Sequence, residues 1–277
     1  MAKICVTGAA GRLGRAVVRD LLDHGHEVVA TDARPGPQDL GTQVLLADLT
    51  EYGQAAEVLD GAGAVVHLAN IPAPGIHTPS ETFNRNTTMN SNVFLAAARA
   101  GAGRVVWASS ETTLGLPFDV PPRYAPVDED HYPFPTSTYS LSKVVTETLA
   151  QHISQWSGIP FVGLRFSNIL GPADYEDFPG YWRDATLRRW NLWGYIDERD
   201  AAAACRLALD APAEGARALV IAAADTVMNR PSAELMKEVF PGVEIRRDLG
   251  EFETLLAIDA ARDALGFVPR HSWRDHL

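Results

Sequence analysis

The sequence predicts an α/β protein with a doubly wound parallel sheet. Short apolar runs alternate with helix-like segments through the first 165 residues, and a glycine stands just after four of those segments. Strands that alternate with helices in this way form a parallel sheet with helices on both faces. The chain of 277 residues is long enough to bury a substantial core around such a sheet.

Six strands and four helices account for this pattern. A glycine just past a helix readily adopts the left-handed conformation that ends it, and Gly25, Gly61, Gly101 and Gly158 occupy such places. We expect strands at residues 4–7, 27–31, 43–47, 64–68, 104–108 and 161–165, and helices at residues 12–24, 52–60, 81–100 and 137–156.

The pattern loosens from about residue 168. Proline and aromatic residues between 171 and 193 follow no clear period, and helical patterns return only at 199–209 and 232–240. Asp200 is expected to cap the first of these helices. We therefore expect residues 1–167 to form one domain, and residues 168–277 to form mostly a small lobe that is interleaved with it.

Composition and charge exclude several classes of protein. The 46% hydrophobic and 21% charged residues are typical of a globular protein, and no apolar run is long enough to span a bilayer. We expect a cytoplasmic location because the N-terminus lacks the pattern of a secretory signal. A net charge of -11 argues against a nucleic-acid partner. Cys5 and Cys205 stand in apolar surroundings and predict buried thiols, with no disulfide framework and no metal site.

A glycine-rich turn joins the first strand to the first helix. Gly8 permits a tight turn, Gly11 lets the backbone approach a pyrophosphate, and Gly14 packs the helix against the strand. Taken alone, the spacing also fits a tight turn that binds nothing. The predicted cofactor contacts in this turn are Gly8, Gly11, Arg12, Leu13 and Gly14.

The end of the second strand indicates which dinucleotide binds. Asp32 stands 18 residues after Gly14, where a carboxylate can accept hydrogen bonds from both adenosine ribose hydroxyls and repel a 2′-phosphate. Arg34 could turn onto such a phosphate, or it could be a solvated cation in the loop before Pro35. The sequence favours NAD over NADP.

Tyr139 and Lys143 are the most informative pair of residues. Their i,i+4 spacing in a helix puts the phenol and the ammonium group on one face. A free tyrosine has a pKa of about 10, so a nearby cation is needed for it to act as a base near neutrality. The pair could also be an exposed Tyr and Lys on a surface helix, but the glycine turn and the six strands argue against that.

These features together resemble the short-chain dehydrogenase/reductase family over nearly the whole chain. The segment 165–172, Arg-x-x-Asn-x-x-Gly-Pro, is similar to the extended branch, the NAD-dependent epimerases and dehydratases. The resemblance implies a Rossmann-type sheet with a small C-terminal substrate-binding lobe, and hydride transfer to or from NAD. It implies that Tyr139 exchanges a proton with the substrate and that Lys143 also holds the nicotinamide ribose.

The resemblance implies further site residues. Counting back from Gly115 puts Ser110 on the family's catalytic Ser/Thr position, with Ser109 as the alternative. Asp48, which could instead cap the next helix, stands where the family contacts adenine. The remaining implied cofactor contacts are Leu49, Leu68, Ala69, Asn70, Asn86, Tyr139, Lys143 and Ser167, and the implied substrate contacts are Ser110, Glu111 and Asn168.

The family carries out several reactions, and residues outside the catalytic core must choose among them. A dehydratase would carry Asp-Glu after the catalytic Ser/Thr, whereas this chain has Glu111-Thr112. The short lobe favours a small substrate, and the overall length and the Ala-Ser-Ser segment at 108–110 resemble uronate dehydrogenases. We expect NAD-dependent oxidation of a sugar, uronic acid or related small polyol. A sugar-nucleotide 4-epimerase is the alternative, and a non-enzymatic dinucleotide sensor a third.

The sequence does not decide which arginine side chains point into the site, nor the oligomeric state. Arg183, Arg188 and Arg189 could bind a substrate carboxylate or phosphate, or they could be solvated. The family habit implies a homodimer through the helices at 81–100 and 137–156.

Overall fold

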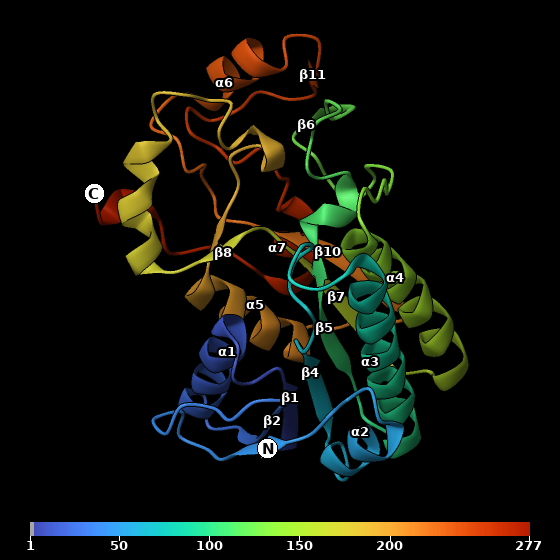
Figure 1. The fold of residues 1–277 in the computed structure, drawn as a ribbon. Helices are drawn as coiled ribbons and strands as arrows, with labels where there is room; N and C mark the ends of the chain where they lie inside the picture. The colour runs from blue at the N-terminus through green and yellow to red at the C-terminus, as the bar shows by residue number, and fades with distance from the viewer. Residues whose placement is uncertain (1–2) are drawn as a thin grey trace.

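The computed structural model describes residues 3–277 and contains a seven-stranded sheet in which every neighbouring pair is parallel (Figure 1). The order across the sheet is β10-β7-β5-β4-β1-β2-β3. The chain therefore winds one way from β1 to β3 and the other way from β4 to β10, and the switch lies between β1 and β4. Ligands of open α/β sheets bind at the carboxyl ends of the strands beside such a switch. The strands are β1 (Lys3–Thr7), β2 (Glu27–Asp32), β3 (Val44–Leu46), β4 (Ala64–His67), β5 (Val105–Ser110), β7 (Phe161–Phe166) and β10 (Ala216–Ile221).

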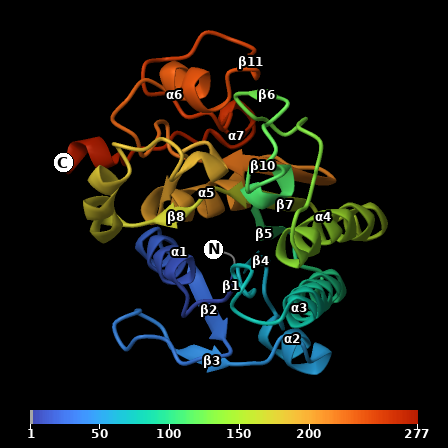
Figure 2. The same cartoon turned by 45° about the horizontal axis from the view of Figure 1, so that its top comes forward.

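Helices cover both faces of the sheet (Figure 2). On one face α1 packs against α5, and on the other α3 packs against both α2 and α4. The doubly wound α/β fold predicted from the sequence is thus confirmed. The helices are α1 (Arg12–Asp23), α2 (Tyr52–Val58), α3 (Pro79–Ala100), α4 (Thr138–Ser157), α5 (Glu198–Asp210), α6 (Ser232–Val239) and α7 (Asp259–Leu265).

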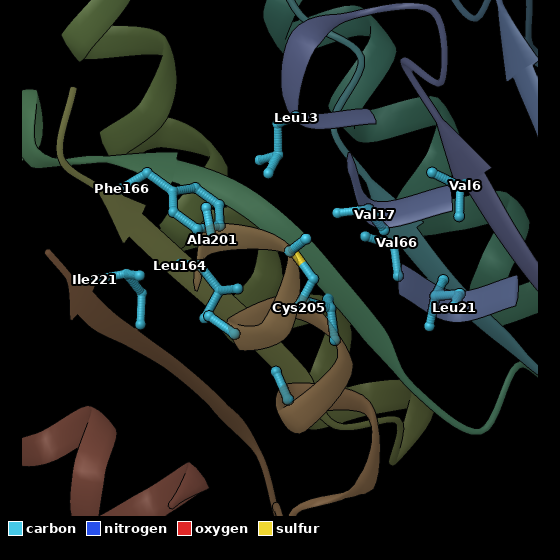
Figure 3. Packing of buried hydrophobic residues seen from close by; sticks show 14 of the residues in the cluster. Val6, Leu13, Val17, Leu21, Val66, Leu164, Phe166, Ala201, Cys205 and Ile221 are labelled. Atoms are coloured by element: carbon cyan, nitrogen blue, oxygen red, sulfur yellow. The ribbon is translucent and has the colours of Figure 1, made fainter. Parts of the chain in front are cut away.

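Three hydrophobic clusters form the core. The first lies between the sheet and the α1–α5 layer, where Val17, Leu164 and Cys205 interlock (Figure 3). The second lies under α2, α3 and α4 and includes Phe94 and Trp107. The third joins the segment at 114–127 to the C-terminal part of the chain at 175–273. Both cysteines are free and buried, as predicted.

All six predicted strands are present, and β10 is an additional one. β10 pairs with β7 from Ala216–Phe161 to Ile221–Phe166, although it belongs to the part of the chain where the sequence pattern loosens. Residues 218–221, Ala-Leu-Val-Ile, form a short apolar run like the other strands. A run of four such residues does not by itself distinguish a strand from a buried helix segment, and the pairing with β7 decides it. Two short pairs also join distant segments: β6 (Tyr124–Ala125) with β11 (Glu244–Ile245), and β8 (Ile169–Leu170) with β9 (Ile196–Asp197).

The helix ends follow the predicted signals with one exception. The four glycines after the first four helices all have positive φ angles. Asp200, however, does not cap α5, because Asp197 is the N-cap and accepts a hydrogen bond from Arg199 N. The Asp200 carboxylate instead accepts hydrogen bonds from the backbone of Arg270 and His271. No helix within residues 3–277 is long and apolar enough to cross a membrane.

Candidate active site

The glycine turn between β1 and α1 is packed so closely that side chains are excluded. Gly8 has a φ of +71°, and a Cβ there would lie 2.7 Å from Ala69 N. A Cβ on Gly14 would lie 2.0 Å from Gly8 O. Gly11 is the N-cap of α1 and offers no capping side chain. The first backbone N–H groups of α1 are therefore available to an anion, and the cradle fits a pyrophosphate.

Replacing Gly14 with alanine is expected to destabilise the protein by about 1–3 kcal/mol and to weaken NAD binding, because two backbone segments would have to separate. Urea unfolding and fluorescence titration with NADH measure the two effects. Gly53→Ala is the matched control, because a Cβ on this helical glycine meets nothing within 4 Å. It is expected to stabilise α2 by up to about 1 kcal/mol. If Gly14→Ala and Gly53→Ala have the same free energy of unfolding and the same affinity for NADH, close packing at Gly14 is not the cause.

Asp32 ends β2 and reaches over the glycine turn. Its Oδ2 accepts a hydrogen bond from Ala10 N at 3.0 Å, and its Oδ1 accepts one from Arg34 N at 3.1 Å. Each carboxylate oxygen keeps acceptor capacity for a further hydroxyl. The Arg34 residue is exposed. The turn thus presents a fixed carboxylate beside the N-terminus of α1.

The loop after β4 closes the other side of the glycine turn. Leu68 N and Ala69 N donate to Thr7 Oγ1 at 3.2 and 3.3 Å. The buried Asn86 side chain accepts from Ile71 N at 2.8 Å and donates to Ile71 O at 3.1 Å. Asn86 therefore shapes the segment at 68–71, which lies against Gly8.

A buried polar network ties β1, β4, α3 and α4 together. The two ring nitrogens of His67 are each 2.7 Å from a partner, Thr7 Oγ1 and Asn90 Oδ1. Asn90 also accepts from Asn70 Nδ2 at 2.8 Å and donates to Thr146 Oγ1 at 2.7 Å. The sequence does not predict the contact between Asn90 and Thr146, because only the packing of α3 against α4 brings them together.

The buried imidazole of His67 should make stability depend on pH. Burial lowers its pKa to about 4, against the opposing effect of the Asn90 hydrogen bond. An unfolded histidine binds a proton below about pH 6.5, so the unfolded state takes up protons between pH 6.5 and 4 that the folded state does not. Stability should therefore fall by about 2 kcal/mol between pH 7 and pH 5 from this group alone.

Urea unfolding at pH 7 and pH 5 measures this contribution. His67→Gln is expected to remove it whatever its effect at neutral pH, and His152→Gln is the control because His152 is exposed. If the free energy of unfolding of His67→Gln falls between pH 7 and pH 5 by as much as that of the wild type, the pH dependence does not come from His67.

Tyr139 and Lys143 lie in the first turns of α4, which begins with a capping box between Ser137 and Ser140. Lys143 Nζ donates to Ala108 O at 2.7 Å and lies 5.6 Å from the centre of the Tyr139 ring. Burial lowers the pKa of Lys143 to about 7, and the charge of Glu147 opposes this effect.

Ser110 stands beside the Tyr139 phenol. Burial raises the pKa of Tyr139 to about 12, the hydrogen bond with Ser110 acts against that rise, and the charge of Glu111 adds to it. Ser110 Oγ already accepts from Thr112 N at 3.2 Å and from Thr112 Oγ1 at 2.9 Å. Its own proton is therefore free to point toward the phenol. The structure brings Ser110, Tyr139 and Lys143 together.

Ser109 faces a different set of groups. Its hydroxyl donates to Glu147 Oε1 at 2.6 Å. The same carboxylate accepts from Arg165 Nε and Nη2, both at 2.9 Å. Ser109 is thus part of an ion-pair network behind Lys143, whereas Ser110 is on the side of Tyr139.

Other residues expected at the site have partners of their own. Asp48 Oδ1 accepts from Thr50 N at 3.0 Å and from Thr50 Oγ1 at 2.7 Å, and the N-cap of α2 is Glu51 rather than Asp48. Leu49 is buried. The Arg12 guanidinium is paired with Asp174. Arg12 thus links the start of α1 to the segment that contains Asp174, and Asp48 holds the loop between β3 and α2.

Glu111 is buried next to Ser110. Burial raises its pKa to about 7, against the opposing effects of Ser167, Asn191 and Arg188 and of the Asn168 backbone. Of the three arginines that the sequence left undecided, Arg188 is buried while Arg183 and Arg189 are exposed. Asn191 is not predicted from the sequence, because it lies in an irregular segment with no recognisable motif.

Comparisons with known proteins agree with this geometry. Residues 4–222 match the model of the NAD dependent epimerase/dehydratase family. A UDP-glucose 4-epimerase of Rhizobium leguminosarum bv. trifolii is 27% identical over 323 aligned positions, covering 97% of this chain and 93% of the relative. An NAD-dependent glucose-6-phosphate dehydrogenase of Haloferax volcanii is 28% identical over 197 positions, covering 65% of this chain and 74% of the relative.

A solved structure of a mutated uronate dehydrogenase superposes with a TM-score of 0.70. It is 23% identical, and the match covers 99% of this chain and 85% of that one. At this identity the likeness concerns the fold.

Proposed function

This chain belongs to the NAD-dependent epimerase/dehydratase family, the extended branch of the short-chain dehydrogenases/reductases, and on that premise we propose that it oxidises a hydroxyl group of a sugar, a uronic acid or a related small polyol. The observation that carries the proposal is the grouping of Ser110, Tyr139 and Lys143 at the carboxyl edge of the sheet that also carries the glycine turn. In the coarser sense, the chain is an NAD-dependent sugar oxidoreductase or epimerase.

The three side chains divide the chemistry among them. In the free protein, the Ser110 hydroxyl donates its one hydrogen bond to the Tyr139 phenol oxygen, which favours the phenolate. When substrate binds, Ser110 donates this hydrogen bond to the substrate oxygen instead. The phenolate takes the proton of the substrate hydroxyl. The ammonium group of Lys143 stabilises the phenolate and holds the nicotinamide ribose. NAD, when bound, supplies the acceptor for the hydride.

The turn beside these residues fits the cofactor. Gly8, Gly11 and Gly14 leave room for the pyrophosphate at the start of α1. Asp32 would accept hydrogen bonds from the adenosine ribose, and its charge would repel a 2′-phosphate. NAD is therefore the proposed cofactor. The remaining proposed contacts are Arg12, Leu13, Asp48, Leu49, Leu68, Ala69, Asn70, Asn86 and Ser167.

Both a dehydrogenase and an epimerase have support. The relative from Haloferax volcanii is named as a dehydrogenase of a sugar phosphate, and the alignment with the 4-epimerase has 323 positions against 277 residues in this chain. The epimerase therefore carries insertions that this chain lacks, which favours a smaller substrate here. The match to the 4-epimerase of Rhizobium leguminosarum bv. trifolii covers 97% of this chain. This nearly complete coverage supports the epimerase alternative.

Net formation of NADH separates the two reactions. We expect absorbance at 340 nm to rise when purified protein is mixed with NAD and a free sugar, uronic acid or polyol, and to rise more slowly with NADP. An epimerase returns the hydride to the sugar, so it converts a UDP-sugar with no accumulation of NADH. If UDP-sugars are converted and no free sugar is oxidised, the dehydrogenase proposal is wrong.

We also propose that α3 and α4 form the interface of a homodimer. Both helices carry an exposed leucine, Leu95 on α3 and Leu141 on α4. Sedimentation equilibrium that detects only the 30.0 kDa monomer would contradict this.

A further inference from the structure

Four buried polar side chains beside Ser110 each have one atom with no partner at full hydrogen-bonding distance and angle, although Ser167 lies near enough to the Glu111 carboxylate to lower its pKa. We call Glu111, Ser167, Arg188 and Asn191 the Glu111 cluster; each is less than 9% exposed. Within residues 3–277, seven buried side-chain polar atoms have no partner, and four of them belong to this cluster. Because an unsatisfied buried polar group is costly, such a concentration indicates a place where a ligand completes the hydrogen bonding.

The orientation of the free atoms is fixed by the bonds that the other atoms make. Asn191 Nδ2 donates to Gly194 O at 2.9 Å and to Glu111 Oε1 at 3.3 Å, so Asn191 Oδ1 is the free atom. Arg188 Nη2 donates to Gly194 O at 3.2 Å, and the guanidinium lies 5.0 Å from the Trp190 ring centre. Arg188 Nε is its free atom.

The cluster adjoins the proposed reaction centre. Glu111 directly follows Ser110, and its charge acts on the Tyr139 phenol. Ser167 directly follows β7, which pairs with β5 up to Ser110 and Phe166. Both residues therefore lie at the carboxyl edge of the sheet, where ligands of open α/β sheets bind.

The four free atoms differ in what they can bind. Glu111 Oε2, when ionised, and Asn191 Oδ1 can only accept hydrogen bonds, while Arg188 Nε can only donate. Ser167 Oγ can do both. A hydroxyl group both donates and accepts, so two neighbouring hydroxyls can satisfy all four atoms. A carboxylate can only accept, so it can take hydrogen bonds from Arg188 Nε and Ser167 Oγ, but it leaves Glu111 Oε2 and Asn191 Oδ1 without donors and lies against the charge of Glu111.

We propose that the Glu111 cluster binds two neighbouring hydroxyl groups of a neutral sugar or polyol and discriminates against substrates that present a carboxylate there. This inference rests on the proposed function and narrows its substrate class from sugars and uronic acids to neutral polyhydroxyl compounds.

Matched pairs of substrates test the inference. NADH formation is measured at pH 8.5 with glucose against glucuronate and with galactose against galacturonate. The wild-type protein is expected to show kcat/KM at least about tenfold higher for the neutral member of a pair. Preference for the uronate in both pairs would overturn the proposal.

Glu111→Gln replaces one acceptor oxygen with an amide donor at nearly the same shape. It is expected to raise KM for the neutral sugar about tenfold. The ratio of kcat/KM for the neutral sugar to kcat/KM for the uronate should fall by a similar factor, while KM for NAD stays unchanged. Glu129→Gln is the control, because Glu129 is also a partly buried glutamate but its carboxylate accepts from Val220 N outside the cluster. Unchanged KM values and an unchanged ratio in Glu111→Gln would mean that the substrate does not reach the cluster.

Binding without turnover separates this inference from the proposed function. Calorimetric titration of the protein and NADH with the same four sugars measures affinity alone. If neutral sugars bind, Glu111→Gln abolishes their preference and no NAD is reduced, then the proposed oxidation fails and the inference stands. If neither class of sugar binds, the inference is overturned.

Discussion

Tyr139→Phe is expected to lower kcat by about 10²–10⁴-fold, the range typical of general acid–base catalysis. The variant loses only the phenolic oxygen, so the ring that packs beside Lys143 remains. The affinity for NAD and the melting temperature should therefore change little. Initial rates of NADH formation, with fluorescence titration of NADH as the second readout, measure the effect.

Tyr132→Phe is the matched control for this prediction. Tyr132 is 59% exposed and lies outside α4, so loss of its hydroxyl should leave kcat within about twofold. Retention of the wild-type rate by Tyr139→Phe would exclude the phenol as the proton acceptor. If Tyr139→Phe also kept the biological activity of the protein, a dinucleotide sensor would be favoured over an enzyme.

Glu147→Gln is expected to destabilise the protein by about 3–5 kcal/mol, because it removes the carboxylate that pairs directly with the buried charge of Arg165 and leaves it the weaker contact with Glu129. The side chains of Arg165 and Glu147 are only 7% and 12% exposed, and two Arg165 nitrogens lie 2.9 Å from the carboxylate. Ser109 also loses its charged acceptor. Urea unfolding at pH 7 measures the change in the free energy of unfolding.

Two further variants show whether burial of the charge is the cause. Asp39→Asn breaks an ion pair with Arg19 of 3.1 Å whose side chains are 78% and 49% exposed, and it should cost at most about 1 kcal/mol. The double variant Glu147→Leu with Arg165→Met removes both charges and should be more stable than Glu147→Gln. A cost for Glu147→Gln no larger than that for Asp39→Asn would contradict the argument.

The parts of the site that the sequence predicted are those set by local geometry. The spacing of Gly8, Gly11 and Gly14 reflects one turn and the start of one helix, and the structure leaves no room for a side chain at Gly8 or Gly14. Tyr139 and Lys143 share a face because four residues span about one helical turn. Such relations hold wherever the helix is placed in the fold.

The choice between Ser109 and Ser110 depended on how β5 packs against α4. The two serines end β5 and meet different residues of that helix, since Ser109 contacts Glu147 and Ser110 contacts Tyr139. Counting to Gly115 selected Ser110 from the sequence. Only the structure gives the reason, since Ser109 is held by the carboxylate of Glu147.

By itself, the sequence determined the α/β class, six of the seven strands of the main sheet, the glycine turn and the tyrosine–lysine pair, because periodicity and short spacings are local properties. The tertiary structure alone decided that β10 joins the sheet and that Arg188 and Asn191 meet Glu111. Glu111 and Asn191 are 80 residues apart in the chain. Contacts at such separations arise from packing between elements, and the sequence of neither segment encodes its partner.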